Sequence, residues 1–258
     1  IDRFGKGVRT APRDALIADS AQDKKRGAAF GLHRAMDTLG ATIGVFAAYL
    51  LIAKYKGTFK NIFLISLIPA FLGVLFLFWV KEKKGQSQTQ GSPEKIQFSC
   101  FSVKLNAGSR IAGIWQALDR KLKLFLIFTF IFTLGNSSNQ FLLLRAKYLG
   151  CALDKVILFY LVYNIIYALV AYPASRLSDK IGRKKLLVLG YLFYGLVYLG
   201  FAINKSANNF WFLFGIYGLY MGFTEGVEKA LVADIAPVGL RATTIGLHAT
   251  LVGIGLLP

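Results

Sequence analysis

Two stretches of the chain, ALIADSAQDKKRGAAFGLH at residues 15–33 and ALVADIAPVGLRATTIGLH at residues 230–248, align with each other without a gap. Every matched pair has the same offset of 215 residues, the step from position 15 to position 230. Both histidines of the chain, His33 and His248, fall on this register. Other matched pairs are Asp19 with Asp234, Arg26 with Arg241, and Gly31 with Gly246. The shared register indicates an internal duplication.

Long uncharged apolar runs surround the two copies, in a chain that is 55% hydrophobic. The runs are Thr38–Ala53, Asn61–Val80, Leu124–Leu144, Val156–Ser175, Leu186–Asn204, Ser206–Thr224 and Ala242–Pro258. A helix needs about 20 apolar residues to cross a bilayer core about 30 Å thick. The pattern therefore predicts an all-α polytopic membrane protein. We see no clustered catalytic carboxylates and no set of metal ligands, so we expect neither an enzyme nor a cofactor.

Lys and Arg are distributed unevenly between the two sides that these runs define. If the loop at 176–185 is cytoplasmic, alternation places residues 1–29, 81–123 and 225–241 on the same side. That side holds 23 basic residues and the opposite side holds 7. Such an excess follows the positive-inside rule. The net charge of +18 then reflects topology and attraction to anionic lipid, and we expect no binding to nucleic acid.

The position of the duplication constrains the architecture. The first copy introduces the first apolar run and the second copy introduces the seventh, so one repeat contains six helices. Because six is even, both repeats face the same way across the membrane. The polar stretch 81–123 is the predicted cytoplasmic linker between them. Residues 1–80 then hold the end of helix 4 with helices 5 and 6, and residues 124–258 hold helices 7–10 and the start of helix 11.

The loop Ser175-Arg176-Leu177-Ser178-Asp179-Lys180-Ile181-Gly182-Arg183-Lys184 is similar to a loop motif of the major facilitator superfamily. The resemblance implies a 12-helix fold and a permease that works by alternating access, either a symporter or an antiporter. It implies a multi-pass, monomeric protein of the cell membrane that contacts lipids and a small-molecule substrate. A small drug, a sugar and an organic anion all remain as substrates. A passive uniporter and a non-transporting receptor of the same fold are the alternatives.

Charges at matched positions of the two copies change sign. Arg13 matches Glu228, and Asp14 matches Lys229. Because charges in the membrane region need partners, we expect Arg13 with Glu228, helped by Asp14 with Lys229, to close a cytoplasmic gate. The alternative is that these side chains only extend to the inner surface.

A second charge pattern joins each copy to the motif loop. Asp19 precedes Arg26 by the same spacing as Asp234 precedes Arg241. With Asp179, Gly182 and Arg183 of the loop, the resemblance implies an intradomain salt-bridge network. Local helix capping by the same residues is the alternative.

Two carboxylates are candidates for proton coupling. By helix geometry Asp37 lies about 16 Å deeper than Arg26, and Glu225 about 13 Å deeper than Asp234. A charged carboxylate is costly at such depth, so it binds a proton readily. The alternative for Asp37 is a structural pair with Arg34, three residues earlier on the same helix face.

Uncharged polar residues interrupt the run that begins at Leu124. We expect Asn136, Asn139 and Gln140 to contact the substrate, with Asn164 in the next run as a further candidate. Hydrogen bonds to neighbouring helices are the alternative for these side chains.

Overall fold

The computed structural model describes residues 10, 13–21, 25–53, 64–69, 71–73, 75, 118–136, 138–237 and 240–255. The chain divides into two compact units, one formed by residues 1–53 and 118–258 and the other by residues 54–117. In the second unit only helical turns between residues 64 and 75 are described. The predicted linker therefore lies mostly outside the described residues, and the boundaries predicted for the two repeats stay a prediction.

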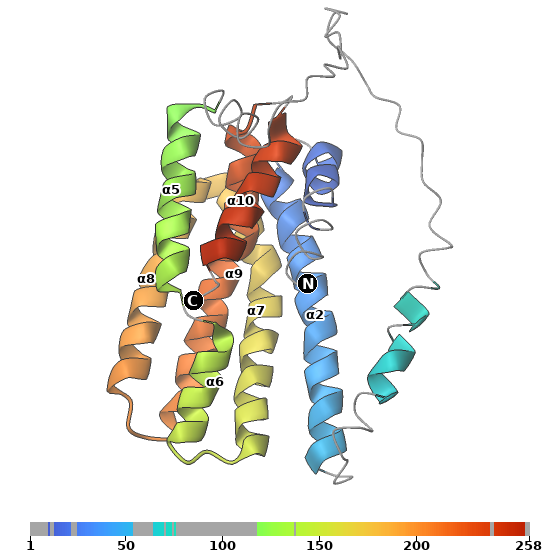
Figure 1. Ribbon diagram of the computed structural model, residues 1–258, viewed down its shortest axis with the longest axis vertical. Coiled ribbons are helices and arrows are strands. Elements are labelled where there is room, and N and C mark those ends of the chain that lie inside the picture. Colours follow the sequence, from blue (N-terminus) through green and yellow to red (C-terminus); the bar gives the residue numbers. More distant parts are fainter. Residues whose placement is uncertain are drawn as a thin grey trace, which may run out of the picture. The chain divides into compact units, whose positions relative to one another are not determined.

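The first unit is a bundle of helices (Figure 1). They are α2 (Arg26–Ala53), α5 (Arg120–Gly135), α6 (Asn139–Tyr148), α7 (Leu153–Ile181), α8 (Arg183–Ile203), α9 (Asn209–Ile235) and α10 (Arg241–Gly255). A further helical segment covers residues 13–20. Three of the described helices are long and apolar enough to cross a membrane, over Arg26–Ile52, Leu153–Ile181 and Arg183–Ile203. The all-α membrane fold expected from the sequence is confirmed.

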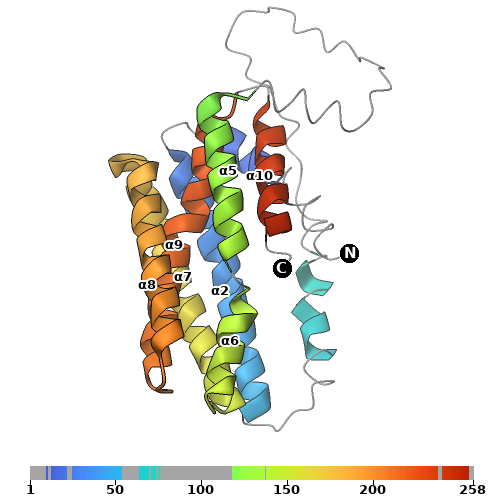
Figure 2. The ribbon, with the colours of Figure 1, turned by 60° about the vertical axis from the view of Figure 1, so that its left-hand side comes forward.

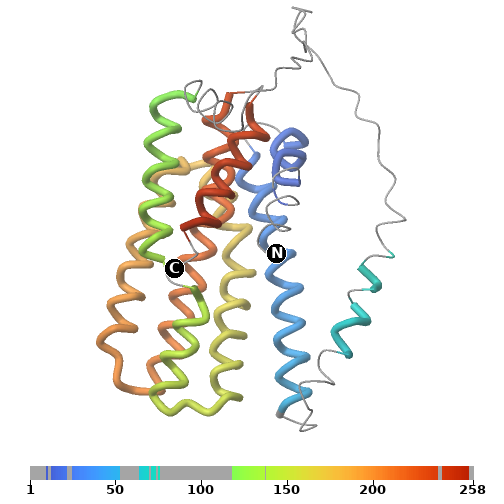
Figure 3. Tube along the Cα trace, in the orientation of Figure 1, coloured from blue at the N-terminus to red at the C-terminus, as the bar shows by residue number. Residues whose placement is uncertain are grey.

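The helix ends gather at two opposite ends of this unit, as the trace in Figure 3 shows. One end, called here the cytoplasmic end after the charge bias, holds the starts of α2, α5, α8 and α10 and the ends of α7 and α9. The other end holds the end of α2, the α6–α7 and α8–α9 turns, and nothing of the duplicated segments. Helices α7, α8, α9 and α10 thus alternate in direction, whereas α6 continues in the direction of α5. Both copies of the duplication lie at the same end.

Helix α2 lies along α7 in both ribbon views (Figures 1 and 2). The approach depends on small residues, because a Cβ added to Gly31 would lie 2.7 Å from the Ser175 Oγ and 2.9 Å from the Ala171 carbonyl oxygen. From α9, Gly226 faces the same place, with the Gly31 Cα 3.4 Å from the position of its missing Cβ. Small residues allow such close packing of helix backbones in a membrane.

The apolar run Leu124–Leu144 is not one helix. Helix α5 ends at Gly135, and Asn136 follows in an extended conformation with φ −89° and ψ 100°. Helix α6 then begins after Ser138, whose side chain accepts from the Gln140 N–H at 3.4 Å. The side chains of this polar stretch compete with the backbone for hydrogen bonds, which favours a break. Irregular backbone at membrane depth is tolerated only where protein or a watery cavity covers it.

Candidate functional site

A polar cavity of about 350 Å³ lies where α2, the α5–α6 break, α7, α9 and α10 face one another. Three acidic or basic side chains line it, Arg34 from α2 and Glu225 and Glu228 from α9. The other polar lining residues are Thr133, Asn136, Ser138, Asn139, Gln140, Tyr160, Tyr217, Tyr220 and Thr224. A concave site with a few converging polar groups and aromatic walls is typical of a small-molecule pocket.

Tyrosine hydroxyls orient two of the amides predicted to contact the substrate. The Tyr198 hydroxyl donates to the Asn136 Oδ1 at 3.2 Å, and the Asn136 Nδ2 donates to the Tyr220 hydroxyl at 3.4 Å. The Tyr217 hydroxyl donates to the Asn139 Oδ1 at 2.6 Å. Both amides therefore make hydrogen bonds between helices and line the cavity as well, so the two interpretations of these residues are compatible.

The two remaining candidates for substrate contact lie in different places. Gln140 lines the cavity. Asn164 is only 3% exposed and donates to the carbonyl oxygen of Tyr160, one turn earlier in α7, at 2.7 Å. Its amide is turned back onto its own helix, so Asn164 is not part of the cavity lining.

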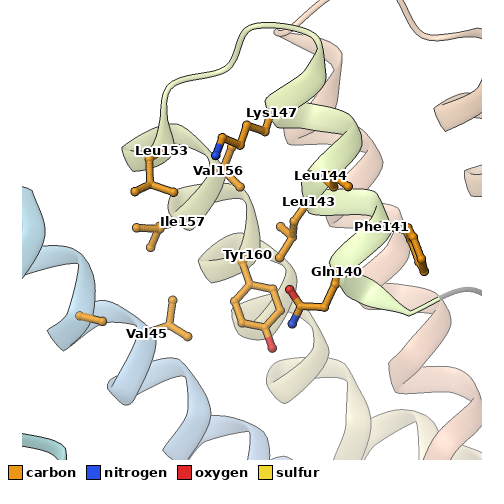
Figure 4. A pocket seen from close by; sticks show the side chains of 11 residues that line it. Val45, Gln140, Phe141, Leu143, Leu144, Lys147, Leu153, Val156, Ile157 and Tyr160 are labelled. Carbon is orange, nitrogen blue, oxygen red and sulfur yellow. The ribbon is translucent and has the colours of Figure 1, made fainter. Parts of the chain in front are cut away.

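An apolar hollow of about 530 Å³ adjoins the cavity, between α2, α6 and α7 (Figure 4). Gln140 and Tyr160 line both spaces. Lys147 lies at the end of the hollow away from these two side chains. Apolar side chains cover most of the remaining wall, among them Val45, Leu143, Leu153, Val156 and Ile157. The polar cavity and the apolar hollow can thus together accommodate a molecule with one polar and one apolar part.

Arg34 binds both carboxylates that were candidates for proton coupling. Its guanidinium lies 2.6 Å from Glu225 and 2.9 Å from Asp37. The Tyr167 hydroxyl accepts from Arg34 and donates to Glu225, and its ring lies 5.2 Å from the guanidinium carbon. The Glu225 side chain is 27% exposed and the Asp37 side chain 55% exposed, so the pair with Glu225 is the more strongly held of the two. The structural pair of Arg34 with Asp37 is therefore present, and a proton on either acid would weaken this cluster.

The four residues predicted to form a gate gather near the cytoplasmic end, but in another pairing than expected. The Asp14 carboxylate is 1% exposed and lies 2.9 Å from the Lys229 Nζ and 3.1 Å from Arg13. Arg13 thus pairs with its neighbour in the chain instead of with Glu228. The Glu228 carboxylate accepts from the Tyr191 hydroxyl of α8 at 2.8 Å. Asp14, shared by two cations, is the centre of this group.

The acid–base pattern of the two copies forms crossed pairs. Arg26 lies 3.2 Å from Asp234, and Arg241 lies 2.8 Å from Asp19. Each arginine also donates through its Nε to the backbone carbonyl that precedes the acid of its own copy, Arg26 to Ala18 at 3.3 Å and Arg241 to Ala233 at 3.1 Å. These four contacts obey the 215-residue register, since each has its counterpart in the other copy. The network expected within one domain thus also joins one copy to the other, because the equivalent helix ends face each other here.

The motif loop completes this network. The Asp179 carboxylate accepts from the backbone N–H groups of Gly27 and Ala28 at 3.0 and 2.9 Å, at the start of α2. A carboxylate at a helix N-terminus is favoured by the helix dipole. Arg183 pairs with Asp179 at 3.1 Å and also with the carboxylate of Asp234. Gly182 makes the turn between α7 and α8 with a φ of +98°, a conformation that residues with a side chain rarely adopt.

Sequence reasoning missed the tyrosines of the site. Tyr163 and Tyr167 occupy one buried face of α7, one helix turn apart, and Tyr191 comes from α8. The signal was the spacing of Tyr160, Tyr163 and Tyr167, which places them on the same side of a helix. The sequence could not show that the hydroxyls of Tyr167 and Tyr191 bind charged groups of other helices, or that the Tyr163 hydroxyl accepts from the Asn139 amide.

A helical bundle with a polar cavity, and with both copies of a duplication at one end, defines a polytopic membrane protein built from repeats. The chain belongs to the Major Facilitator Superfamily, whose sequence profile matches residues 2–257. The membership predicted from the motif loop and the repeat is confirmed. No solved structure matches the chain significantly.

Three relatives illustrate the similarity. The chain is 40% identical to an uncharacterized MFS-type transporter of Methanocaldococcus jannaschii, over 100% of this chain and 62% of the relative. It is 23% identical to the cis,cis-muconate transport protein of Acinetobacter baylyi, over 90% of this chain and 55% of the relative. It is 30% identical to multidrug resistance protein 2 of Bacillus subtilis, over 33% of this chain and 21% of the relative. The chain thus spans less than two thirds of the length of these relatives.

Proposed function

We propose that this protein is a secondary active transporter that moves a small solute across a membrane by alternating access. The observation that carries the proposal is the set of crossed ion pairs between the two copies, which lies at the cytoplasmic end beside a polar cavity. Residues of the first copy hold residues of the second through Asp14–Lys229, Arg26–Asp234 and Arg241–Asp19. A carrier closed toward the cytoplasm needs contacts of this kind.

The pairs have a strength suited to a gate. Exposed ion pairs contribute about 0–1 kcal/mol each, and buried pairs lose more when one partner is removed. Asp19 is well exposed, whereas Asp14 is almost fully buried. We propose that these contacts break together when the two halves separate at this end. A total of a few kcal/mol allows a ligand to shift the balance between two conformations.

The cavity and the hollow beside it support a substrate with a polar and an apolar part. Amides and tyrosine hydroxyls in the cavity offer hydrogen bonds, and the hollow offers apolar surface. The relatives named for muconate and for multidrug resistance suggest two probes of opposite charge, cis,cis-muconate and the lipophilic cation ethidium. We further propose that transport is coupled to protons, since acidic side chains line the cavity.

Flux measured in proteoliposomes tests this function. The purified protein is reconstituted, and uptake of each probe is followed with and without a pH gradient across the membrane. We expect uptake above that of protein-free liposomes, and accumulation against the probe's gradient only when the pH gradient is present. Uptake that ignores the pH gradient would indicate a passive uniporter. Binding of a probe without any flux would indicate a receptor and would refute transport.

A further inference from the structure

A mostly buried carboxylate of α9 and a buried imidazole of α10 face each other. The Glu228 Oε2 of α9 lies 4.0 Å from the His248 Nε2 of α10. Both residues lie seven positions from the cytoplasmic end of their helices, Ile235 and Arg241, which is about 10 Å along a helix axis. The pair lies between the cavity, which Glu228 lines, and the ion pairs of the cytoplasmic end.

Glu228 differs from the other acids near the cavity in having no permanent cation as a partner. Among the described residues, its contacts are the Tyr191 hydroxyl and the imidazole of His248. Glu225 and Asp37 are both held by Arg34. A carboxylate that is withdrawn from water without a cation is costly in its charged form.

His248 also has a buried polar atom without a hydrogen-bond partner among the described residues. Its side chain is 6% exposed, and its Nε2 is buried with no hydrogen-bond partner in the part of the chain that the structure describes. The ring stacks on Phe125 of α5, with 6.3 Å between ring centres and 8° between ring planes, so the imidazole is held facing Glu228. An unpaired buried polar atom costs about 1–3 kcal/mol. One proton placed between the two side chains would give each of them a partner.

We propose that Glu228 and His248 together form a proton-binding site, which is the site that couples transport to protons. The inference rests on the proposed transport function and locates the coupling at a different acid from Asp37 and Glu225. When the proton is bound, the neutral carboxyl of Glu228 donates to the Nε2 of His248, and the net charge of the pair changes from −1 to 0. This hydrogen bond needs only a small approach from 4.0 Å.

Other ionisable groups surround the pair and set the pH at which it binds a proton. They are Tyr191 from α8, Tyr220, Glu225 and Lys229 from α9, Asp14 from the segment 13–20, and, through Glu225, Arg34 from α2. Lys229 follows Glu228 directly in the chain and bridges to Asp14. A unit change of charge at the pair therefore acts on the contact that holds the two copies together.

The duplication supplies an internal comparison. On the 215-residue register His248 matches His33, and Glu228 matches Arg13. The first copy thus has a histidine with a cation at the equivalent position, where a shared proton is disfavoured. The His33→Gln variant is consequently a matched control, since it removes the other imidazole and leaves the proposed site intact.

Infrared difference spectroscopy of the purified protein in lipid nanodiscs tests the site without any transported substrate. We expect acidification to produce a carboxyl band that is absent from Glu228→Gln and present in His33→Gln and in Glu225→Gln. In His248→Gln the midpoint of the band should shift by about one pH unit, because the coupled partner is gone. In Tyr191→Phe the band should form at higher pH, because the carboxylate has lost a hydrogen-bond donor.

Three results would overturn the proposal. The first is a band that persists in Glu228→Gln, and the second is a band midpoint that is unchanged in His248→Gln. The third is a midpoint shift in His33→Gln as large as that in His248→Gln. If Glu228→Gln does not fold, the His248→Gln and Tyr191→Phe shifts decide alone. Flux of cis,cis-muconate or ethidium by a protein that lacks the band would refute this site and leave the transport function standing. A protein that shows the band but no flux would support the proton-binding site and refute the transport function.

Discussion

A hydrogen atom in place of a side chain determines how closely α2 approaches α7. Gly31 lies against Ser175, which is fully buried, and against Gly226 of α9, so three helices meet at residues with little or no side chain. Close-packed helix interiors do not absorb added volume without strain. The position of Arg34, one turn further along α2, follows from this contact, and with it the ion pair to Glu225.

Replacing Gly31 by valine should therefore destabilise the protein. The new methyl groups would collide with Ser175 and with backbone atoms of α7, and overpacking of this kind costs about 1–3 kcal/mol. Gly44→Val is the matched control on the same helix, because no described atom lies within 4 Å of its added Cβ. Thermal unfolding of the purified variants in detergent measures the effect. Equal unfolding temperatures for the two variants would contradict the packing described here.

At the scale of the element, the start of α2 is held by a side chain from another helix. Asp179 accepts from two backbone N–H groups there and pairs with Arg183. The contact links α7 to α2, and α2 carries residues of the first copy. In the alternating-access cycle proposed above, it would therefore stabilise the closed cytoplasmic end more than either helix alone.

Asp179→Asn should shift the protein away from this closed state. Loss of the charge removes about 1 kcal/mol of interaction with the helix N-terminus, roughly a fivefold change in population. A cysteine placed at Thr224, which lines the cavity, reports the change through its rate of labelling from the cytoplasmic side. Asp154 is an exposed acid in the first turn of α7, the helix that also holds Asp179. Asp154→Asn is therefore the control and should leave the labelling rate unchanged. A slower rate in Asp179→Asn would argue against the closing role.

Helices were predictable where a long apolar pattern determined them. They were less predictable where their ends and pairings depend on contacts with other parts of the fold. The apolar runs predicted α7 and α8 within a few residues, and the register predicted that residues 19 and 234 lie at the same end. The break between Gly135 and Asn139 was not predicted, because its polar residues were read as part of one span. The pairing of Arg13 with Asp14 was not predicted either, because the sequence does not show whether Arg13 contacts Asp14 or Glu228.

At the scale of the molecule, the charge bias and the fold together predict which helix ends face the cytoplasm. Cysteines replacing Lys25 and Lys184 should be labelled by an impermeant thiol reagent from one side only, the cytoplasmic one. Cysteines replacing Lys155 and Lys205 should be labelled only from the other. All four positions are exposed, and both native cysteines are first changed to serine. Labelling of Lys25→Cys and Lys184→Cys from opposite sides would rule out parallel repeats.

The crossed pairs give the molecule its most specific test, because they connect residues more than 200 positions apart. Asp19→Arg or Arg241→Asp alone should lower flux in the reconstituted protein by roughly tenfold, the effect of about 1.4 kcal/mol in one conformation. The double exchange Asp19→Arg with Arg241→Asp should restore most of it, since Asp19 is 63% exposed and accommodates a longer side chain. Exchanging Asp19 with Arg26, the pair closer in sequence, should not restore flux, because Arg26 contacts Asp234 instead.

A second exchange tests whether the ion pairs between the copies act together as a gate or as independent surface pairs. Asp14→Lys with Lys229→Asp also reverses a bridge between the copies, but Asp14 is buried and contacts Arg13 as well. The exchanged lysine would face that arginine, and like charges at a buried site repel strongly. Rescue should therefore be poor here and good for the pair of Asp19 and Arg241. Equal rescue at both sites would contradict the central place given to Asp14, because it would show that neither its burial nor its contact with Arg13 affects the exchange.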